Sequence, residues 1–176
     1  MKNNKVYNMV VNSLLIALVF VATSVIKIQL PISNTGGLIH MGNVALFTIA
    51  LVFGKNKGAI SGAFGMALFD ILSPYAVWAP FTFVIRGVMG YMIGYIAYKN
   101  NKSGNSVLYN GIAIIVSSIW MIAGYFTANI ILYRNIPAAI SSIPGDIIQI
   151  VIGIIVAVPL TKLLKSIGIQ KLVSKL

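Results

Sequence analysis

Lysine clusters recur along this chain at intervals that match membrane-spanning segments, and this spacing constrains the fold more than any other feature. Ten of the 13 basic residues form four clusters: Lys2 and Lys5; Lys55 and Lys57; Lys99 and Lys102; and Lys162, Lys165, Lys171 and Lys175. The apolar stretches between clusters are long enough to cross a bilayer once or twice. Six crossings place all four clusters on one side and leave Lys27 and Arg134 on the other. This is the positive-inside distribution of membrane proteins, and it predicts cytoplasmic termini.

Composition favours a membrane protein over a soluble domain. With a mean hydropathy of +0.94 and 9% charged residues, the chain has too little polar surface to cover a soluble globule. A net charge of +11 is common in nucleic-acid-binding proteins, but here the basic residues flank apolar stretches and do not line one helix face. We therefore expect no nucleic acid partner. The charge should instead face the anionic inner leaflet of a lipid bilayer.

The predicted fold class is an all-α membrane protein with six transmembrane helices, which forms one integral membrane domain over residues 1–176. The expected spans are 6–26, 39–53, 58–72, 80–98, 107–132 and 146–164. The second and third spans have only 15 residues each, or roughly 22 Å of helix against a hydrocarbon core of about 30 Å. Either their hairpin stops below the outer surface and leaves a depression there, or the bilayer is thinned locally.

Motifs of catalysis are missing from the sequence. No G-x-x-x-x-G-K-[ST] segment is present, so the chain does not hydrolyse ATP through a P-loop. His40 is the only histidine and there is no cysteine, which leaves little material for a metal site or a thiol nucleophile. The only acids, Asp70 and Asp146, are far apart in the sequence. We therefore expect neither an enzyme nor a bound cofactor or metal.

Three charged residues stand inside otherwise apolar segments. Asp70, Arg86 and Asp146 are expected in the outer half of the membrane, where His40 also opens a span. A charge at mid-bilayer costs about 2.5–3.5 kcal/mol on insertion scales, so each should face the bundle interior, a partner or water. One interpretation is structural: an Asp70–Arg86 ion pair, with Asp146 as a helix N-cap. The other is a polar pocket open to the outside, and an ion pair can also form the wall of a pocket.

Aromatic and amide side chains are expected at the same level of the membrane. They are Tyr75, Trp78, Phe81, Tyr125, Asn129, Tyr133 and Gln149. Tyr75 and Tyr133 are also typical of the aromatic belt at a membrane interface. Tyr125 and Asn129 are spaced i, i+4 and so share one helix face, where a buried amide requires a partner. Together these residues predict a site for a small planar ring.

Small residues form a separate pattern. Gly58 and Gly62 are spaced for close helix packing, as are Gly90 and Gly94, and Ser13 and Ala17 repeat the spacing in the first span. Such faces serve either packing within one chain or docking of another membrane helix.

Five segments, in this order, carry a family resemblance: 36–43 (GGLIHMGN), 53–59 (FGKNKGA), 70–73 (DILS), 78–82 (WAPFT) and 143–149 (IPGDIIQ). Taken together they resemble the substrate-binding S component of energy-coupling factor (ECF) transporters, over nearly the whole chain. The nearest branch is the hydroxymethylpyrimidine or pyridoxine type, which is related to the riboflavin S components.

The resemblance implies a subunit that captures a small vitamin or vitamin precursor at the outer face of the bacterial cytoplasmic membrane. Pyridoxine or a hydroxymethylpyrimidine-like ring is expected before riboflavin or another B vitamin. It also implies partners, namely a transmembrane T component and two cytosolic ATPases. The first outer loop, 28–39, would cap the substrate, and Ser13 and Ala17 would meet the T component.

Two positions depart from the family pattern. Asn43 stands where the pattern has Asp after the histidine, and Met89 stands where the branch often has an acid. The pocket is therefore expected to be less acidic. The complete set of expected substrate-binding residues is His40, Asn43, Asp70, Tyr75, Trp78, Phe81, Arg86, Tyr125, Asn129, Tyr133, Asp146 and Gln149.

Two other classes of membrane protein fit parts of the sequence. A structural or assembly subunit would use the buried polar groups for packing alone, and it would bind no ligand. A self-sufficient secondary transporter would show paired repeats and broken helices at the midplane, which we do not find. Bound ligand separates the first from an S component, and uptake without ATPase partners separates the second.

Overall fold

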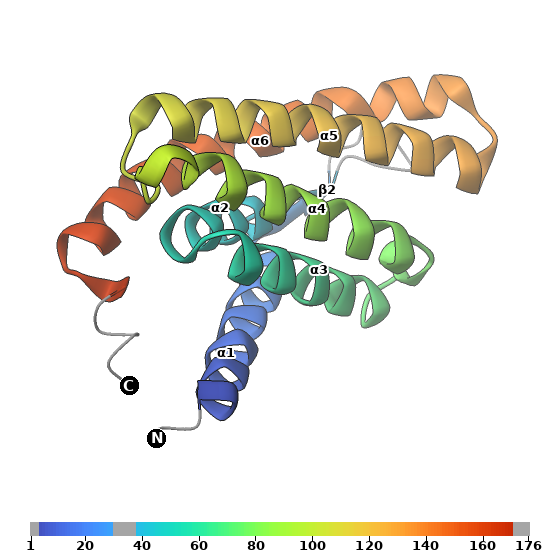
Figure 1. The fold of residues 1–176 in the computed structure, drawn as a ribbon. Coiled ribbons are helices and arrows are strands. Elements are labelled where there is room, and N and C mark those ends of the chain that lie inside the picture. Colours follow the sequence, from blue (N-terminus) through green and yellow to red (C-terminus); the bar gives the residue numbers. More distant parts are fainter. Residues whose placement is uncertain (1–3, 30–37, 171–176) are drawn as a thin grey trace.

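The computed structural model describes residues 4–29 and 38–170, and Figure 1 shows their arrangement. Part of the expected substrate-capping loop, residues 30–37, lies outside the described residues, as do Lys2, Lys171 and Lys175. In chain order the elements are α1 (Asn4–Val25), β1 (Lys27–Gln29), β2 (Leu38–His40), α2 (Gly42–Phe53), α3 (Lys55–Ile71), η1 (Ala76–Trp78), α4 (Ala79–Ala97), η2 (Lys99–Asn101), α5 (Val107–Tyr133) and α6 (Ile136–Ser166).

Four helices are long and apolar enough to cross a membrane, namely α1, α4 with the preceding η1, α5 and α6. The helical membrane class predicted from the sequence is therefore confirmed. α2 is apolar but has only 12 residues, a length of about 18 Å that falls short of a hydrocarbon core. α3 has 17 residues and carries Lys55 and Lys57 in its first turn.

The start of α6 was wrong in the sequence prediction. The helix begins at Ile136 and not near residue 146, and only Arg134 and Asn135 separate it from α5. Asn135 is the N-cap, since its side-chain oxygen accepts a hydrogen bond from the Ala138 N–H at 3.0 Å. Pro144 and Pro159 both lie inside this 31-residue helix. Within a membrane a helix satisfies its own backbone polar groups, so a proline bends it without ending it.

α2 is the central element of the fold. Its residues from Gly42 to Val52 are all buried, and the helix packs against α1, α3, α4 and α6. Phe47 and Leu46 are completely inaccessible to solvent. A short helix that is apolar on every side is stable only when other helices surround it, so α2 positions its neighbours around a common core.

The small-residue faces of α3 and α4 pack against each other. A Cβ atom on Gly90 would lie 2.3 Å from the carbonyl oxygen of Gly58, and one on Gly94 would lie 2.2 Å from the backbone nitrogen of Lys55. These two faces therefore serve internal packing, one of the two alternatives that the sequence left open. Ser13 and Ala17 of α1 differ from them because both remain exposed.

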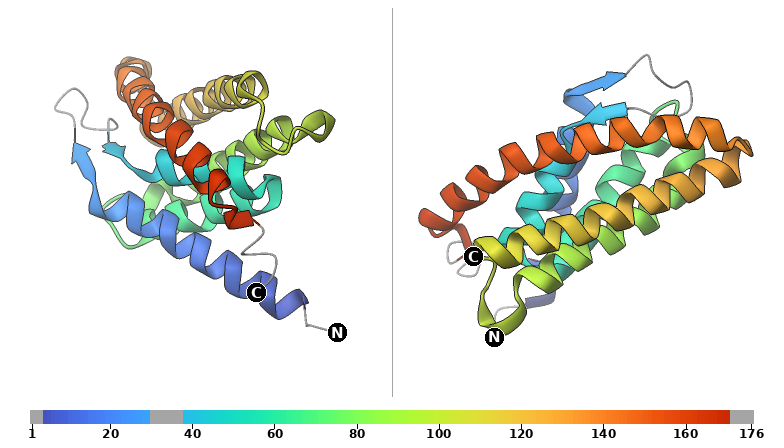
Figure 2. Two further views of the ribbon diagram at one scale, coloured as in Figure 1. Left: turned by 90° about the vertical axis from the view of Figure 1, so that its left-hand side faces the viewer. Right: turned by 90° about the horizontal axis from the view of Figure 1, so that it is seen from above.

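A short hairpin connects α1 to α2. β1 pairs with β2 in antiparallel register, with Lys27 opposite His40 and Gln29 opposite Leu38. The sequence prediction treated this region as loop alone. The two views of Figure 2 show the strands beside α6, close to the start of α2. The hairpin thereby fixes both ends of the connection that the sequence predicts to lie over the site.

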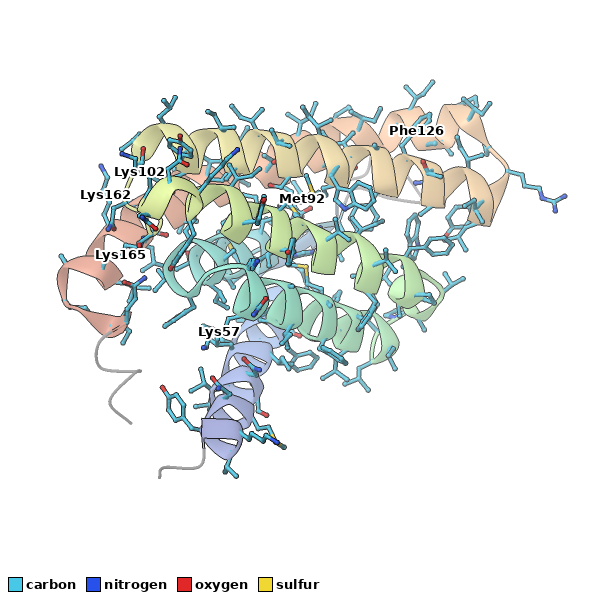
Figure 3. The ribbon with its side chains drawn as sticks, viewed as in Figure 1. Lys57, Met92, Lys102, Phe126, Lys162 and Lys165 are labelled. Atoms are coloured by element: carbon cyan, nitrogen blue, oxygen red, sulfur yellow. The ribbon has the colours of Figure 1, made fainter. Side chains whose placement is uncertain are left out.

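Basic side chains gather toward one end of the molecule. In Figure 3, Lys57, Lys102, Lys162 and Lys165 all lie toward the end where α6 finishes. Phe126 of α5 lies toward the opposite end, where α5 turns into α6. The molecule therefore has a lysine-rich end and, opposite it, an end that carries the polar and aromatic residues described next.

Candidate functional site

Arg86 is the most buried charged residue of the site. It lies on α4 with 2% of its surface exposed. Its Nη1 group donates to Asn43 Oδ1 at 2.5 Å, and its Nε donates to the hydroxyl of Tyr125 at 3.0 Å. The sulfurs of Met121 and Met89 lie 3.0 and 3.6 Å from Nη1. The guanidinium also lies 5.0 Å from the centre of the Tyr125 ring. Neutral groups from α2, α4 and α5 therefore surround the cation.

Asp70 does not form the expected ion pair. The structure records no salt bridge between Asp70 and Arg86, both of which it describes. Asp70 is 8% exposed, and its buried Oδ2 oxygen has no hydrogen-bond partner in the part of the chain that the structure describes. The carboxyl group interacts with Thr82 and, electrostatically, with Arg86. The structural interpretation is wrong for this pair because Arg86 turns its donors toward Asn43 and Tyr125.

Aromatic rings from two segments, η1 and α5, line one side of the same region. The indole N–H of Trp78 donates to the hydroxyl of Tyr133 at 3.2 Å, and the two rings are 5.9 Å apart. The Trp78 ring also lies 6.1 Å from that of Tyr125. Tyr125 in turn donates to Thr82 at 3.3 Å. Trp78 thus connects the start of α4 and the end of α5 to the group around Arg86.

His40 and Gln149 join the hairpin to α6. Gln149 is 3% exposed, and its Nε2 lies 3.1 Å from Nδ1 and 3.0 Å from Nε2 of the His40 ring. The Gly42 N–H donates to His40 Nδ1 at 3.1 Å, so this ring nitrogen acts as an acceptor. His40 also lies 6.2 Å from the ring of Phe69, which stacks on Tyr75 at 6.3 Å.

Asn129 and Asp146 complete the expected set on α5 and α6. Asn129 is 1% exposed, and its Oδ1 has no hydrogen-bond partner among the residues described. Asp146 is half-buried and interacts electrostatically with Arg86. It is not an N-cap, because Asn135, eleven residues earlier, has that role for the same helix. Phe81 is half-buried and packs against the hydrophobic core.

The structure thus brings six of the twelve predicted residues together in two connected groups. Asn43, Arg86 and Tyr125 form a central polar cluster with Asp70 beside it, and Trp78 and Tyr133 form an aromatic wall. Hydrogen-bonding capacity is left unused at Asp70 Oδ2 and Asn129 Oδ1. No partner is recorded among the described residues for Nη2 of Arg86. A buried polar group without a partner costs about 1–3 kcal/mol, so these groups are suited to a polar ligand.

Sequence reasoning missed three participants. Thr82 lies one turn before Arg86 on α4, and Met121 lies one turn before Tyr125 on α5, so both share a face with a predicted residue. Phe69 directly precedes Asp70 and contacts His40, Tyr75 and the ammonium group of Lys27. The i±4 spacing could have identified the first two. Among residues 4–29 and 38–170, no three His, Asp or Glu side chains are grouped to hold a metal ion.

Comparison with protein families extends these observations to nearly the whole chain. Residues 3–166 match the family described as ECF-type riboflavin transporter, S component. The chain belongs to this family. The resemblance seen in the sequence is thereby confirmed, and the protein is a membrane transport subunit by family rather than a member of an enzyme family.

Individual relatives cover the chain to different extents. A protein of Lactococcus lactis subsp. cremoris named thiamine precursor transporter HmpT is 25% identical over 169 residues, covering 96% of this chain and 94% of the relative. An uncharacterized protein in the gap 3' region of Pyrococcus woesei is 31% identical over 148 residues, covering 84% and 95%. A UPF0397 protein of Streptococcus agalactiae is 30% identical over 102 residues, covering 56% and 53%.

Proposed function

We propose that this S component binds a small, planar vitamin precursor at its outer end, of the hydroxymethylpyrimidine or pyridoxine type. One observation carries the proposal. Polar groups without partners, Asp70 Oδ2 and Asn129 Oδ1, occur in the same region as a buried guanidinium and the rings of Trp78 and Tyr125. The similarity to HmpT, named as a thiamine precursor transporter, supports the same class of substrate.

The chemistry of such a ring fits the unused groups. A ring amino group would donate to Asn129 Oδ1 or Asp70 Oδ2, and a ring nitrogen or hydroxyl would accept from the Arg86 guanidinium. The ring itself would stack against Trp78 or Tyr125. A ligand of about 12 non-hydrogen atoms can gain up to about −18 kcal/mol, whereas nanomolar affinity needs only about −12 kcal/mol. The proposed pocket comprises the twelve residues predicted from the sequence, with Thr82 and Met121 added.

We further propose six membrane spans, with both termini in the cytoplasm of a bacterial cell. In this arrangement α2 and α3 form a short hairpin in the membrane beside the four longer helices. The grouping of Lys57, Lys102, Lys162 and Lys165 at one end supports it, because the positive-inside rule assigns that end to the cytoplasm. The candidate site then opens to the outside, where substrate is captured.

Transport would depend on partners. The chain has no P-loop, so the energy would come from two cytosolic ATPases acting through a transmembrane T component. The exposed small residues Ser13 and Ala17 on α1 support a docking face for that component, since the corresponding faces of α3 and α4 are already occupied within the chain.

A single-tryptophan variant provides a direct binding test. The chain has two tryptophans, and Trp120 donates from its indole N–H to the Ile85 carbonyl oxygen at 3.1 Å, away from the aromatic wall. In Trp120→Phe protein, Trp78 alone would report on the site. Hydroxymethylpyrimidine or pyridoxine should change its fluorescence saturably, at concentrations where thiamine and riboflavin do not.

Two outcomes of this titration would contradict the proposal. A saturable response to riboflavin alone would show that the site binds a larger ring system than the one proposed. No response to any of the four compounds, together with no small molecule found by mass spectrometry of the purified protein, would favour an assembly subunit that binds no ligand.

A further inference from the structure

A cavity lies at the lysine-rich end of the molecule, away from the candidate site. It has a volume of about 460 Å³ and lies between the first turns of α5 and the last turns of α6, with Leu51 of α2 on its inner side. Figure 2, in the view from above, shows α5 and α6 meeting at their short turn and diverging toward this end. Nothing in the proposed uptake of a vitamin precursor uses this cavity.

The lining of the cavity changes from charged to apolar along α6. Lys165 and Lys162 lie at its mouth, Thr161 lies one turn deeper than Lys165, and Val158 and Ile154 follow at i−3 and i−4 steps on the same helix face. The facing side of α5 repeats this order, from Asn110 in its first turn to Ile114 one turn deeper. A cavity whose lining changes from charged to apolar along its length matches an amphipathic molecule that lies along the membrane normal.

Polar groups inside the cavity lack partners. Thr161 is 3% exposed, and its hydroxyl has no hydrogen-bond partner within residues 4–29 and 38–170. Asn110 donates from its amide nitrogen to the Gly104 carbonyl oxygen at 2.8 Å, but its buried Oδ1 has no partner. Lys165 donates to the Ser103 carbonyl oxygen at 2.7 Å, which uses one of its three N–H bonds. The site therefore offers positive charge at its mouth and unused polar groups one turn below.

The cavity is bordered by side chains that face away from the protein. Val107 is 70% exposed and Ile115 is 59% exposed, and both line the cavity on α5. In a membrane protein, exposed apolar side chains of this kind contact lipid. A lipid molecule can therefore enter from the side, without passing through the protein.

We propose that this cavity binds one anionic glycerophospholipid, such as phosphatidylglycerol, from the leaflet at the lysine-rich end. The phosphate interacts with Lys162 and Lys165, an ester carbonyl accepts from the Thr161 hydroxyl, and an acyl chain lies against Ile114, Ile154 and Val158. Basic pockets between membrane helices recognise anionic headgroups by this combination of charge and shape. The inference requires a membrane protein, and it does not depend on which vitamin the outer site binds.

Gly111 offers a way to fill the cavity without disturbing the fold. It lines the cavity, and a Cβ atom added to it would meet nothing within 4 Å. Gly111→Leu therefore places its side chain in the space that the acyl chain would occupy. The basic mouth is tested separately with the double variant Lys162→Gln/Lys165→Gln. Its matched control is Lys57→Gln/Lys99→Gln, which removes the same charge outside the cavity.

The experiment titrates delipidated full-length protein with phosphatidylglycerol or phosphatidylethanolamine in detergent, and counts bound lipids by native mass spectrometry. We expect one phosphatidylglycerol to bind at least tenfold more tightly than phosphatidylethanolamine. Gly111→Leu should remove this lipid, and Lys162→Gln/Lys165→Gln should weaken it about tenfold to thirtyfold, since each base near an anionic headgroup contributes about 1 kcal/mol. The Lys57→Gln/Lys99→Gln control should bind as the unmodified protein does.

Several results would overturn the proposal. Equal affinity for the two phospholipids, unchanged binding by Gly111→Leu, an equal loss in the control pair, or binding of free fatty acid or detergent alone would each do so. The Trp78 titration of the vitamin precursor, run on the same samples, should be unaffected by any of these variants. Failure at the outer site therefore remains distinguishable from failure at this one.

Discussion

At the scale of single residues, the site is defined by which buried polar groups have partners and which do not. Arg86 donates from Nη1 and Nε to Asn43 and Tyr125, which come from different helices, whereas Asn129 Oδ1 has no partner among the described residues. The sequence identified all four residues as candidates. It could not predict the pairing, because Asn43 and Arg86 are separated by 43 positions and meet only through the packing of α2 and α4.

Asn129→Ala should separate binding from stability. Because Asn129 Oδ1 has no partner among residues 4–29 and 38–170, its removal should leave the melting temperature in detergent nearly unchanged. Affinity for the precursor should fall about 5- to 150-fold, which corresponds to the loss of about 1–3 kcal/mol when a buried ligand group loses its partner. We expect losses of the same order for Asp146→Ala and Trp78→Ala.

Thr127→Ala provides the control for Asn129→Ala on the same helix. Thr127 is exposed, and its hydroxyl bonds only the Ala123 carbonyl oxygen of its own helix, at 2.8 Å. The affinity of the Thr127→Ala protein for the precursor should match that of the unmodified protein. Equal affinities for all of these variants would show that the site lies elsewhere.

At the scale of helices, the sequence patterns predicted the ends of α4 and α5 closely but missed the start of α6. α4 and α5 begin and finish within one residue of the expected spans, because Pro80 and Ser106 mark their starts and Arg134 adopts a left-handed conformation at the end of α5. α6 was placed ten residues too late because Pro144 and Gly145 indicate a turn in a soluble protein. In a membrane the cost of unpaired backbone outweighs that local preference.

The contact between α3 and α4 predicts a large effect of one methyl group. A Cβ atom on Gly90 would collide with the backbone of Gly58, so Gly90→Ala should lower stability by about 1–3 kcal/mol. Gly111→Ala adds the same methyl group where nothing lies within 4 Å, so it should raise stability by up to about 1 kcal/mol through helix propensity. Thermal unfolding in detergent compares the two directly. Equal shifts would show that α3 and α4 separate easily.

The exposed face of α1 predicts a separation between binding and assembly. Ala17→Trp should abolish co-purification with the T component, because a bulky ring prevents close approach of a second helix. Affinity for the precursor should stay within a few-fold, since Ala17 is exposed and contacts none of the site residues described above. Ala123→Trp adds the same bulk to an exposed position on α5 and should leave assembly intact. Lost precursor affinity in Ala17→Trp would assign that face to internal packing.

At the scale of the whole molecule, the two ends differ in chemistry. The end where α5 turns into α6 carries the aromatic wall of Trp78 and Tyr133, and the opposite end carries lysines around a lipid-sized cavity. Charge spacing predicted this polarity, because the positive-inside pattern depends only on the order of apolar and basic segments. The cavity could not be predicted, since it results from the angle at which α5 and α6 diverge from their turn.

Cysteine labelling tests the membrane orientation of this polarity. The chain contains no cysteine, so each single-cysteine variant has one reactive position. Lys102 and Arg134 are both exposed and lie before the start and after the end of α5. In intact cells, Lys102→Cys should resist an impermeant thiol reagent, whereas Arg134→Cys should react. After the membrane is permeabilised both should react, which shows that neither side chain is protected by the fold. The reverse pattern in intact cells would place the lysines outside, and the candidate site would then open to the cytoplasm, where it could not capture an external substrate.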